Sequence, residues 1–258
     1  MKKTVLITGA SSGIGLELAK IFASKGNNLV LVARSLQKLE ELKNELERDF
    51  SVSVLNIKKD LSIPNSASEV YNEVKQHQME INYLVNNAGV GVFGPHIKTD
   101  WENEKSMIQL NITSLTELTK LFVKDMVNKK SGKIMNVASV AAFVPGPNMS
   151  IYFASKAFVL NYSEALRSEL SKYGISVTTL CPGATQTNFF DPSPNFKNRT
   201  TKTPLPTAKE VAQYGYSSML NGNSIAIHGI KNKIAVLLTK FSPRNLTLKI
   251  TKKIANNF

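Results

Sequence analysis

Cysteine, long apolar runs and, toward the C-terminus, acidic residues are all scarce in this 258-residue sequence. The one cysteine, Cys181, excludes an internal disulfide and is typical of a protein in a reducing cytosol. No apolar run approaches the roughly 18 residues of a transmembrane helix, and the run at 5–7 is too short for a signal peptide. We therefore expect a cytoplasmic protein, with a peripheral position on the inner membrane face as the alternative.

The scarcity of acid makes the charge lopsided. The net charge is +13, and after Asp191 a single acid, Glu210, opposes 11 lysines and arginines. Among these cations, four apolar residues recur at every fourth position: Leu246, Ile250, Ile254 and Phe258. We interpret residues 230–258 as a basic amphipathic extension. It could pack on its own or a partner subunit, or make weak contact with an anionic membrane. Nucleic-acid binding is not expected, because no nucleic-acid-binding module accompanies the charge.

Short apolar segments alternate with helical patterns along the chain. Strands are predicted near 3–8, 28–33, 51–57, 82–86, 132–138, 175–181 and 224–228. Helices are predicted near 13–25, 36–48, 64–77, 101–128, 152–172 and 207–220. This alternation predicts one α/β domain over residues 1–258, a doubly wound parallel sheet in three layers. Ligands of such sheets bind beyond the carboxyl ends of the strands.

A glycine-rich turn follows the first predicted strand. It contains Gly9, Ser11, Ser12, Gly13, Ile14 and Gly15. Such a turn, leading into a helix, receives a dinucleotide pyrophosphate, because glycines allow close backbone approach and the helix N-terminus offers free N–H groups. The spacing is Gly-x-x-x-Gly-x-Gly rather than the commoner Gly-x-Gly-x-x-Gly. A mere tight turn is the alternative, but the position between strand and helix favours cofactor binding.

Four polar residues in the middle of the chain form a candidate proton-transfer site: Asn111, Ser139, Tyr152 and Lys156. Tyr152 and Lys156 are four residues apart, so they share one face of a predicted helix. A nearby ammonium is expected to lower the tyrosine pKa from about 10 toward neutrality. Ser139 would orient a carbonyl oxygen, and Asn111 would hold a water that links the lysine to solvent.

The Tyr-x-x-x-Lys spacing alone is weak evidence. A second copy, Tyr71 and Lys75, lies in what looks like an ordinary surface helix. The order of several motifs along the chain has to carry the functional argument.

Taken in order, these motifs resemble the short-chain dehydrogenase/reductase family from residue 3 to about residue 190. Residues 8–15 fit its Thr-Gly-x-x-x-Gly-x-Gly signature, residues 86–89 its Asn-Asn-Ala-Gly element, and the four polar residues its catalytic tetrad. The resemblance implies a Rossmann fold and hydride exchange between a nicotinamide cofactor and a carbonyl or alcohol. It also implies further cofactor contacts at Asp60, Leu61, Asn87, Ala88, Gly89, Tyr152, Lys156, Pro182, Gly183, Thr185 and Thr187.

The end of the second predicted strand bears on the choice of cofactor. A site selective for NAD places an acid there for the ribose 2′-hydroxyl, but this chain has Arg34, followed by Ser35 and Lys38. A guanidinium suits a 2′-phosphate. We therefore predict NADP(H), with a solvated loop arginine as the alternative.

The substrate is less well defined by the sequence. Aromatic and apolar residues in the loops at 90–98, 141–150 and 186–206 favour a hydrophobic ketone, aldehyde or 3-ketoacyl group, and the proline-rich stretch 187–206 is a candidate substrate lid. The resemblance implies a homodimer or homotetramer, and the face of Ala157, Phe158, Leu160 and Ala165 is compatible with a partner. The alternatives to a reductase are a non-catalytic dinucleotide-binding redox sensor or scaffold and epimerase or dehydratase chemistry.

Overall fold

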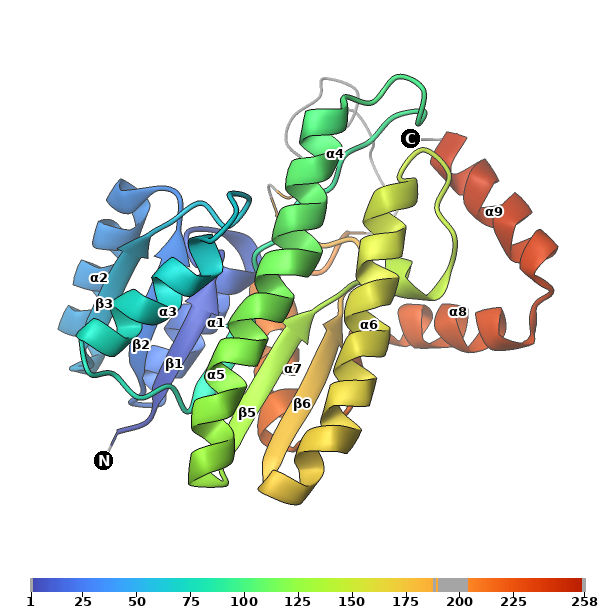
Figure 1. The fold of residues 1–258 in the computed structure, drawn as a ribbon. Helices are drawn as coiled ribbons and strands as arrows, with labels where there is room; N and C mark the ends of the chain where they lie inside the picture. The colour runs from blue at the N-terminus through green and yellow to red at the C-terminus, as the bar shows by residue number, and fades with distance from the viewer. Residues whose placement is uncertain (1, 188, 190–203, 257–258) are drawn as a thin grey trace.

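The computed structural model describes residues 2–187, 189 and 204–256, the last three by their backbone alone. Within that part, strands form one parallel sheet in the order β3-β2-β1-β4-β5-β6-β7 (Figure 1). The strands are β1 (Thr4–Thr8), β2 (Asn28–Ala33), β3 (Val54–Lys58), β4 (Tyr83–Asn86), β5 (Gly132–Val137), β6 (Ile175–Cys181) and β7 (Ile225–Ile227). The predicted parallel α/β sheet is confirmed.

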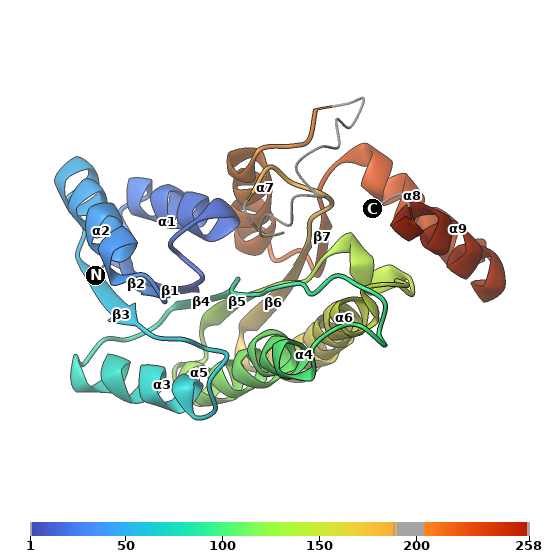
Figure 2. The same cartoon turned by 90° about the horizontal axis from the view of Figure 1, so that it is seen from above.

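Helices cover both faces of this sheet, giving the three predicted layers (Figure 2). One face carries α1 (Gly13–Ser24), α2 (Leu36–Phe50) and α7 (Ala208–Leu220). The other carries α3 (Ser66–Gln76), α4 (Trp101–Ile108), α5 (Leu115–Lys129) and α6 (Ser150–Leu170). Beyond the β7 edge lie α8 (Ile230–Phe241) and α9 (Arg244–Asn256).

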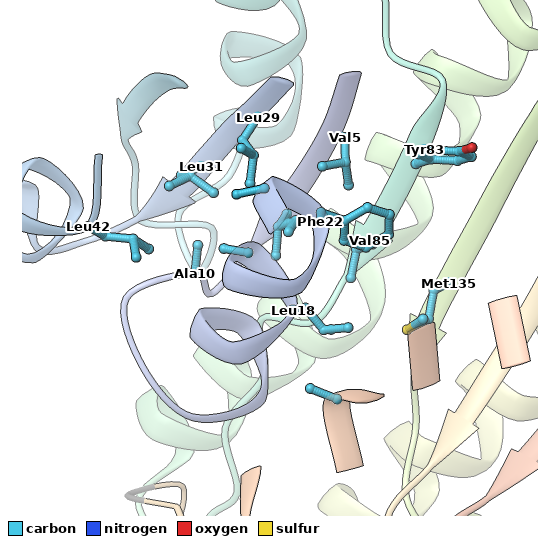
Figure 3. Close-up of a cluster of buried hydrophobic side chains, with 14 of the residues drawn as sticks. Val5, Ala10, Leu18, Phe22, Leu29, Leu31, Leu42, Tyr83, Val85 and Met135 are labelled. Atoms are coloured by element: carbon cyan, nitrogen blue, oxygen red, sulfur yellow. The ribbon is translucent and has the colours of Figure 1, made fainter. Parts of the chain in front are cut away.

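The strands are apolar because both faces of the sheet are covered. On the α1 face, Phe22 of α1 is fully buried in a cluster with residues of β1 and β4, and its ring lies 5.7 Å from that of Tyr83 (Figure 3). Burying a side chain of this size contributes roughly 1.5–3 kcal/mol. The opposite face is filled by residues of α3, α5 and α6, among them Val70 and Phe122. The two cores hold the strand ends in fixed positions.

Strand order reverses between β1 and β4, since β2 and β3 lie to one side of β1 and all later strands lie to the other. The Oγ1 of Thr8, the last residue of β1, accepts hydrogen bonds from the backbone N–H groups of Asn87 and Ala88, each at 3.0 Å. These bonds tie the ends of β1 and β4 together. In open α/β sheets the crevice at such a reversal is where ligands bind.

Several predicted boundaries and one predicted element differ from the structure. The expected continuous helix 101–128 is α4 and α5 joined by a π-helical turn, η1 (Gln109–Ser114). Short 3₁₀ turns, η2 (Val140–Phe143) and η3 (Ser171–Tyr173), were not predicted. Leu160, expected on a partner-facing surface, is buried in the protein's own core. In the described part of the chain, no helix is both long and apolar enough to cross a bilayer.

Candidate active site

The glycine turn lies at the reversal between β1 and β4. Gly9 has φ +67°, in the region that favours glycine, and its N–H donates to the Val32 carbonyl at 2.8 Å. A Cβ on Gly15 would lie 2.3 Å from the Gly9 oxygen and 2.5 Å from Asn87 Nδ2, so no side chain fits there. The backbone of the turn is thus held tightly against the end of β1 and Asn87, and the first turn of α1 contains no acid. Both features fit a bound pyrophosphate.

The start of α1 and the loop after β6 border this turn. Ser12 is the N-cap residue of α1, and its side chain makes no capping hydrogen bond within the described residues. Thr187 approaches from the far side, with its Cγ2 3.1 Å from where a Cβ on Gly13 would lie. The loop after β6, which carries Pro182, Gly183 and Thr185, therefore returns to the glycine turn. This loop is braced by the Thr185 hydroxyl, which donates to the Gly183 carbonyl at 2.9 Å.

Cations cluster beside the turn, where β2 ends. Arg34 and Lys38 are exposed and take no ion-pair partner among the described residues. Ser35 caps α2 and accepts a hydrogen bond from the Lys38 N–H at 3.4 Å. Nearby, Asp60 Oδ1 accepts from the backbone and hydroxyl of Ser62, at 2.9 and 2.7 Å. The guanidinium of Arg34 is thus available for an anionic ligand.

Leu61, another predicted cofactor contact, is held by a hydrogen bond to its backbone. It is buried, and its carbonyl accepts a hydrogen bond from the Ser114 hydroxyl at 2.6 Å. This bond ties the loop after β3 to the π-helical turn that carries Asn111. A segment predicted to contact the cofactor and the turn that carries Asn111 are therefore joined directly.

Tyr152 and Lys156 project from the first turns of α6 and are 6% and 3% exposed. Lys156 Nζ lies 5.8 Å from the centre of the Tyr152 ring and donates to the Val137 carbonyl at 3.0 Å. The Tyr152 ring contacts Phe153 and Phe189, with centroid distances of 5.9 and 5.7 Å. The phenol thus lies in an apolar setting beside a cation.

Burial decides the pKa of both groups. It raises the pKa of Tyr152 to about 12, against the opposing effect of a hydrogen bond with Ser139. It lowers the pKa of Lys156 to about 8, which a nearby thiol, Cys181, partly offsets. The expectation that the lysine lowers the tyrosine pKa is therefore wrong for the cofactor-free protein. Desolvation of the phenolate dominates, and the lysine ammonium is directed at the Val137 carbonyl instead.

Ser139 caps the η2 turn directly after β5. Its Oγ accepts from the Ala141 N–H at 3.1 Å and donates to the Pro182 carbonyl at 3.4 Å. The Ser139 hydroxyl also lies close enough to Tyr152 to lower the pKa of its phenol, so it lies between that phenol and the segment after β6. Ser139 is therefore placed to share one substrate oxygen with Tyr152.

Asn111 lies in the π-helical turn and is 1% exposed. Its Nδ2 donates to the Val90 carbonyl at 2.9 Å and to Ser155 Oγ at 3.1 Å, and its Oδ1 accepts from the Val90 N–H at 3.0 Å. Both amide hydrogens are therefore engaged with protein. The predicted relay water stays a prediction, and only oxygen acceptors of Asn111 remain to hold it. Gly89 joins this group: a Cβ there would lie 3.2 Å from Asn111 Oδ1 and 3.3 Å from Lys156 Nζ.

The second tyrosine–lysine pair is structural. Tyr71 Oη and Lys75 Nζ both contact the carboxylate of Asp125, with closest approaches of 3.3 Å. Tyr71 and Lys75 belong to α3 and Asp125 to α5, so these contacts join two helices on the same face of the sheet (Figure 2). The expectation that this pair belongs to an ordinary surface helix is consistent with these contacts.

A family model for short chain dehydrogenase matches residues 3–198. The chain belongs to the short-chain dehydrogenase family. Its members are oxidoreductases that bind nicotinamide dinucleotides.

Individual relatives agree with this membership. The chain is 34% identical to 17-beta-hydroxysteroid dehydrogenase type 3 of Mus musculus over 83% of its own length and 69% of the relative's. It is 30% identical to very-long-chain 3-oxoacyl-CoA reductase of Anas platyrhynchos over 98% of its own length and 81% of the relative's. A solved short-chain dehydrogenase from Sphingobium yanoikuyae in complex with NADPH is 33% identical, with a TM-score of 0.81 and coverage of 92% and 93%.

Two residues of this short-chain dehydrogenase were missed by sequence reasoning. Ser155 accepts from Asn111 and donates to the Tyr152 carbonyl at 2.7 Å, and Val137 supplies the carbonyl for Lys156. Ser155 adjoins Lys156 in the sequence, and a small polar residue on a buried helix face was the available signal. Most of the predicted lid, at residue 188 and residues 190–203, lies outside the described residues. Its base is described: the N–H of Gln186 donates to the Pro206 carbonyl at 2.9 Å.

Proposed function

We propose that the protein is an NADP(H)-dependent oxidoreductase that interconverts a hydrophobic carbonyl compound and its alcohol. The observation that carries this proposal is the convergence of Ser139, Tyr152 and Lys156 at the strand edge that also holds the glycine turn. A carbonyl group that accepts a hydride needs a proton donor within hydrogen-bond reach of its oxygen. A buried, protonated phenol beside a second hydroxyl is such a donor.

In the proposed mechanism, the glycine turn and the start of α1 would hold the pyrophosphate of the dinucleotide, and Lys156 would hold its ribose. The cofactor, when bound, supplies the hydride. Ser139 orients the substrate carbonyl, and Tyr152 donates a proton to its oxygen as negative charge develops there. The raised pKa of Tyr152 keeps the phenol protonated at neutral pH, which suits reduction. In alcohol oxidation, Tyr152 accepts the proton instead.

The surroundings of Tyr152 favour an apolar substrate. Met149, Phe153 and Phe189 pack around the same small cluster as Tyr152, together with Val90 and Val92. The named relatives act on a steroid or a long-chain acyl group, both of them largely apolar. A bulky ketone or a 3-ketoacyl group is the substrate class that we propose.

A screen of carbonyl compounds tests this function. Purified protein is mixed with NADPH and a panel of ketosteroids, 3-ketoacyl thioesters and simple ketones, and the loss of cofactor absorbance is followed. We expect turnover of at least one bulky apolar ketone and little turnover of acetone. Tight NADPH binding without turnover of any panel member would favour the non-catalytic sensor instead.

The choice of NADP(H) rests on Arg34, which has no acidic neighbour at the end of β2. Arg34→Ala should reduce kcat/KM for NADPH by about 10-fold or more, since a charge-assisted bidentate contact contributes roughly 1.5–3 kcal/mol. The value for NADH should stay near wild type. Lys25→Ala, which removes an exposed cation at the far end of α1, is the matched control. An unchanged NADPH-to-NADH ratio in Arg34→Ala would refute the assignment.

A further inference from the structure

Helix α8 has its apolar side chains on the outside. Ile230, Ile234, Leu237, Leu238 and Phe241 follow helical spacing along one face, and each is more than half exposed, with Phe241 82% exposed. The face turned to the protein carries Val236, which is buried, with half-buried Asn232 and Thr239. A surface helix in a globular protein normally shows the opposite arrangement.

Cations line both sides of this stripe. On a helical projection, Lys231 lies at one edge, and Lys233 and Lys240 lie at the other. All three are exposed. Apolar residues bordered by lysines are typical of helices that lie in the interface of a bilayer, where the aliphatic stems reach down and the ammonium groups meet phosphates.

Helix α9, which follows α8, also exposes apolar and basic side chains. Pro243 separates it from α8, and both helices stand beyond the β7 edge, apart from the two layers that cover the sheet (Figures 1 and 2). Leu246 and Ile250 are about half exposed, and Arg244, Lys249, Lys252 and Lys253 are exposed around them. We call the exposed faces of α8 and α9 the tail surface.

The charge of the tail surface indicates which kind of partner binds it. No aspartate or glutamate follows Glu210 in the sequence, so nothing on these two helices offsets their lysines and Arg244. A two-fold contact between copies would bring two such surfaces together, and the chain as a whole carries +13. An anionic lipid bilayer offers both an apolar layer and complementary charge. We infer that the tail surface docks the protein on anionic phospholipid membranes as a peripheral, non-spanning attachment.

This attachment would lie next to the active site. Helix α8 packs against the η2 turn that follows Ser139. Its Asn232 side chain also lies over Gly183, where an added Cβ would be 2.4 Å from Asn232 Nδ2. Docking would therefore hold the segments after β5 and β6 close to the lipid surface.

Vesicle sedimentation of the full-length protein, without substrate, tests this attachment. Binding to vesicles of phosphatidylcholine with about one-third phosphatidylglycerol should exceed binding to phosphatidylcholine alone by about tenfold or more, and should weaken as salt is raised. The double variant Lys240→Glu/Arg244→Glu should lose about tenfold or more of the binding to anionic vesicles. Phe241→Ser should weaken it severalfold.

Matched controls separate the tail surface from charge in general. Lys25→Glu/Lys124→Glu makes the same change in net charge at exposed sites on α1 and α5, and Ile63→Ser removes an apolar side chain that is 57% exposed. Both should bind vesicles as the wild type does, and circular dichroism should show all variants folded. Equal loss in controls and tail variants, or no binding to anionic vesicles, would overturn the inference. So would a Phe241→Ser variant that binds vesicles normally but dissociates an oligomer in light scattering, because the surface would then be a contact between copies.

Discussion

Tyr152→Phe should lower kcat/KM for carbonyl reduction by about 10²- to 10⁴-fold, the usual contribution of a positioned general acid. The substitution removes the phenolic proton and leaves the ring, which packs against Phe153 and Phe189. Tyr152 is buried, and Phe keeps the shape of its ring. We therefore expect the fold and the affinity for NADPH to stay close to wild type.

Single-turnover oxidation of bound NADPH measures this effect, with cofactor affinity followed separately by calorimetry. Tyr71→Phe is the matched control, because it removes the hydroxyl of a tyrosine of α3 that contacts Asp125, on the opposite face of the sheet from α1. That control should keep the wild-type rate. A Tyr152→Phe enzyme that reduced carbonyls at the wild-type rate would show that the proton comes from another group.

The sheet and the position of the site could be predicted from the sequence because both depend on local patterns. Runs such as 5–7 and 29–32 are apolar enough to require burial on both faces, and the glycine turn can lie only where β1 ends. Ser139 and Pro182 follow strands that are neighbours in the sheet, so the parallel arrangement brings them together. The order of strands and motifs along the chain was sufficient to predict the sheet and the position of the site.

Features that depend on tertiary contacts could not be predicted in this way. The π-helical turn around Asn111 breaks a continuous helical pattern, and Asn111 there makes hydrogen bonds to Val90 and Ser155, which are distant in sequence. The direction of the Tyr152 pKa depends on how deeply the ring is buried. Likewise, the four-residue spacing identified α9 as amphipathic but did not show that α8 directs its apolar stripe outward.

The second large effect is expected from replacing Lys156, a buried charged side chain. Lys156→Met should abolish turnover, because Lys156 is proposed to hold the cofactor ribose beside Tyr152. In the cofactor-free protein at pH 7, however, it should raise stability. A lysine whose pKa falls from 10.5 in the unfolded chain to about 8 in the folded one carries a penalty on the order of 3 kcal/mol while it is charged. Loss of the hydrogen bond to Val137 offsets about 1 kcal/mol.

The sign of this gain should change with pH. Below pH 8 both states of the wild type hold the proton, so Lys156→Met keeps its full advantage, about 1–2 kcal/mol or roughly 2–6 °C in Tm. Between pH 8 and 10.5 the folded wild type releases the proton while the unfolded chain retains it, so wild-type stability rises and the advantage of Lys156→Met shrinks and then reverses. Thermal unfolding of both proteins across this range measures the crossover. Lys75→Met, which removes an exposed lysine paired with Asp125, should show no such trend. A Lys156→Met variant less stable than wild type at pH 7 would mean that the ammonium is well solvated, and the buried-cation description of the site would be wrong.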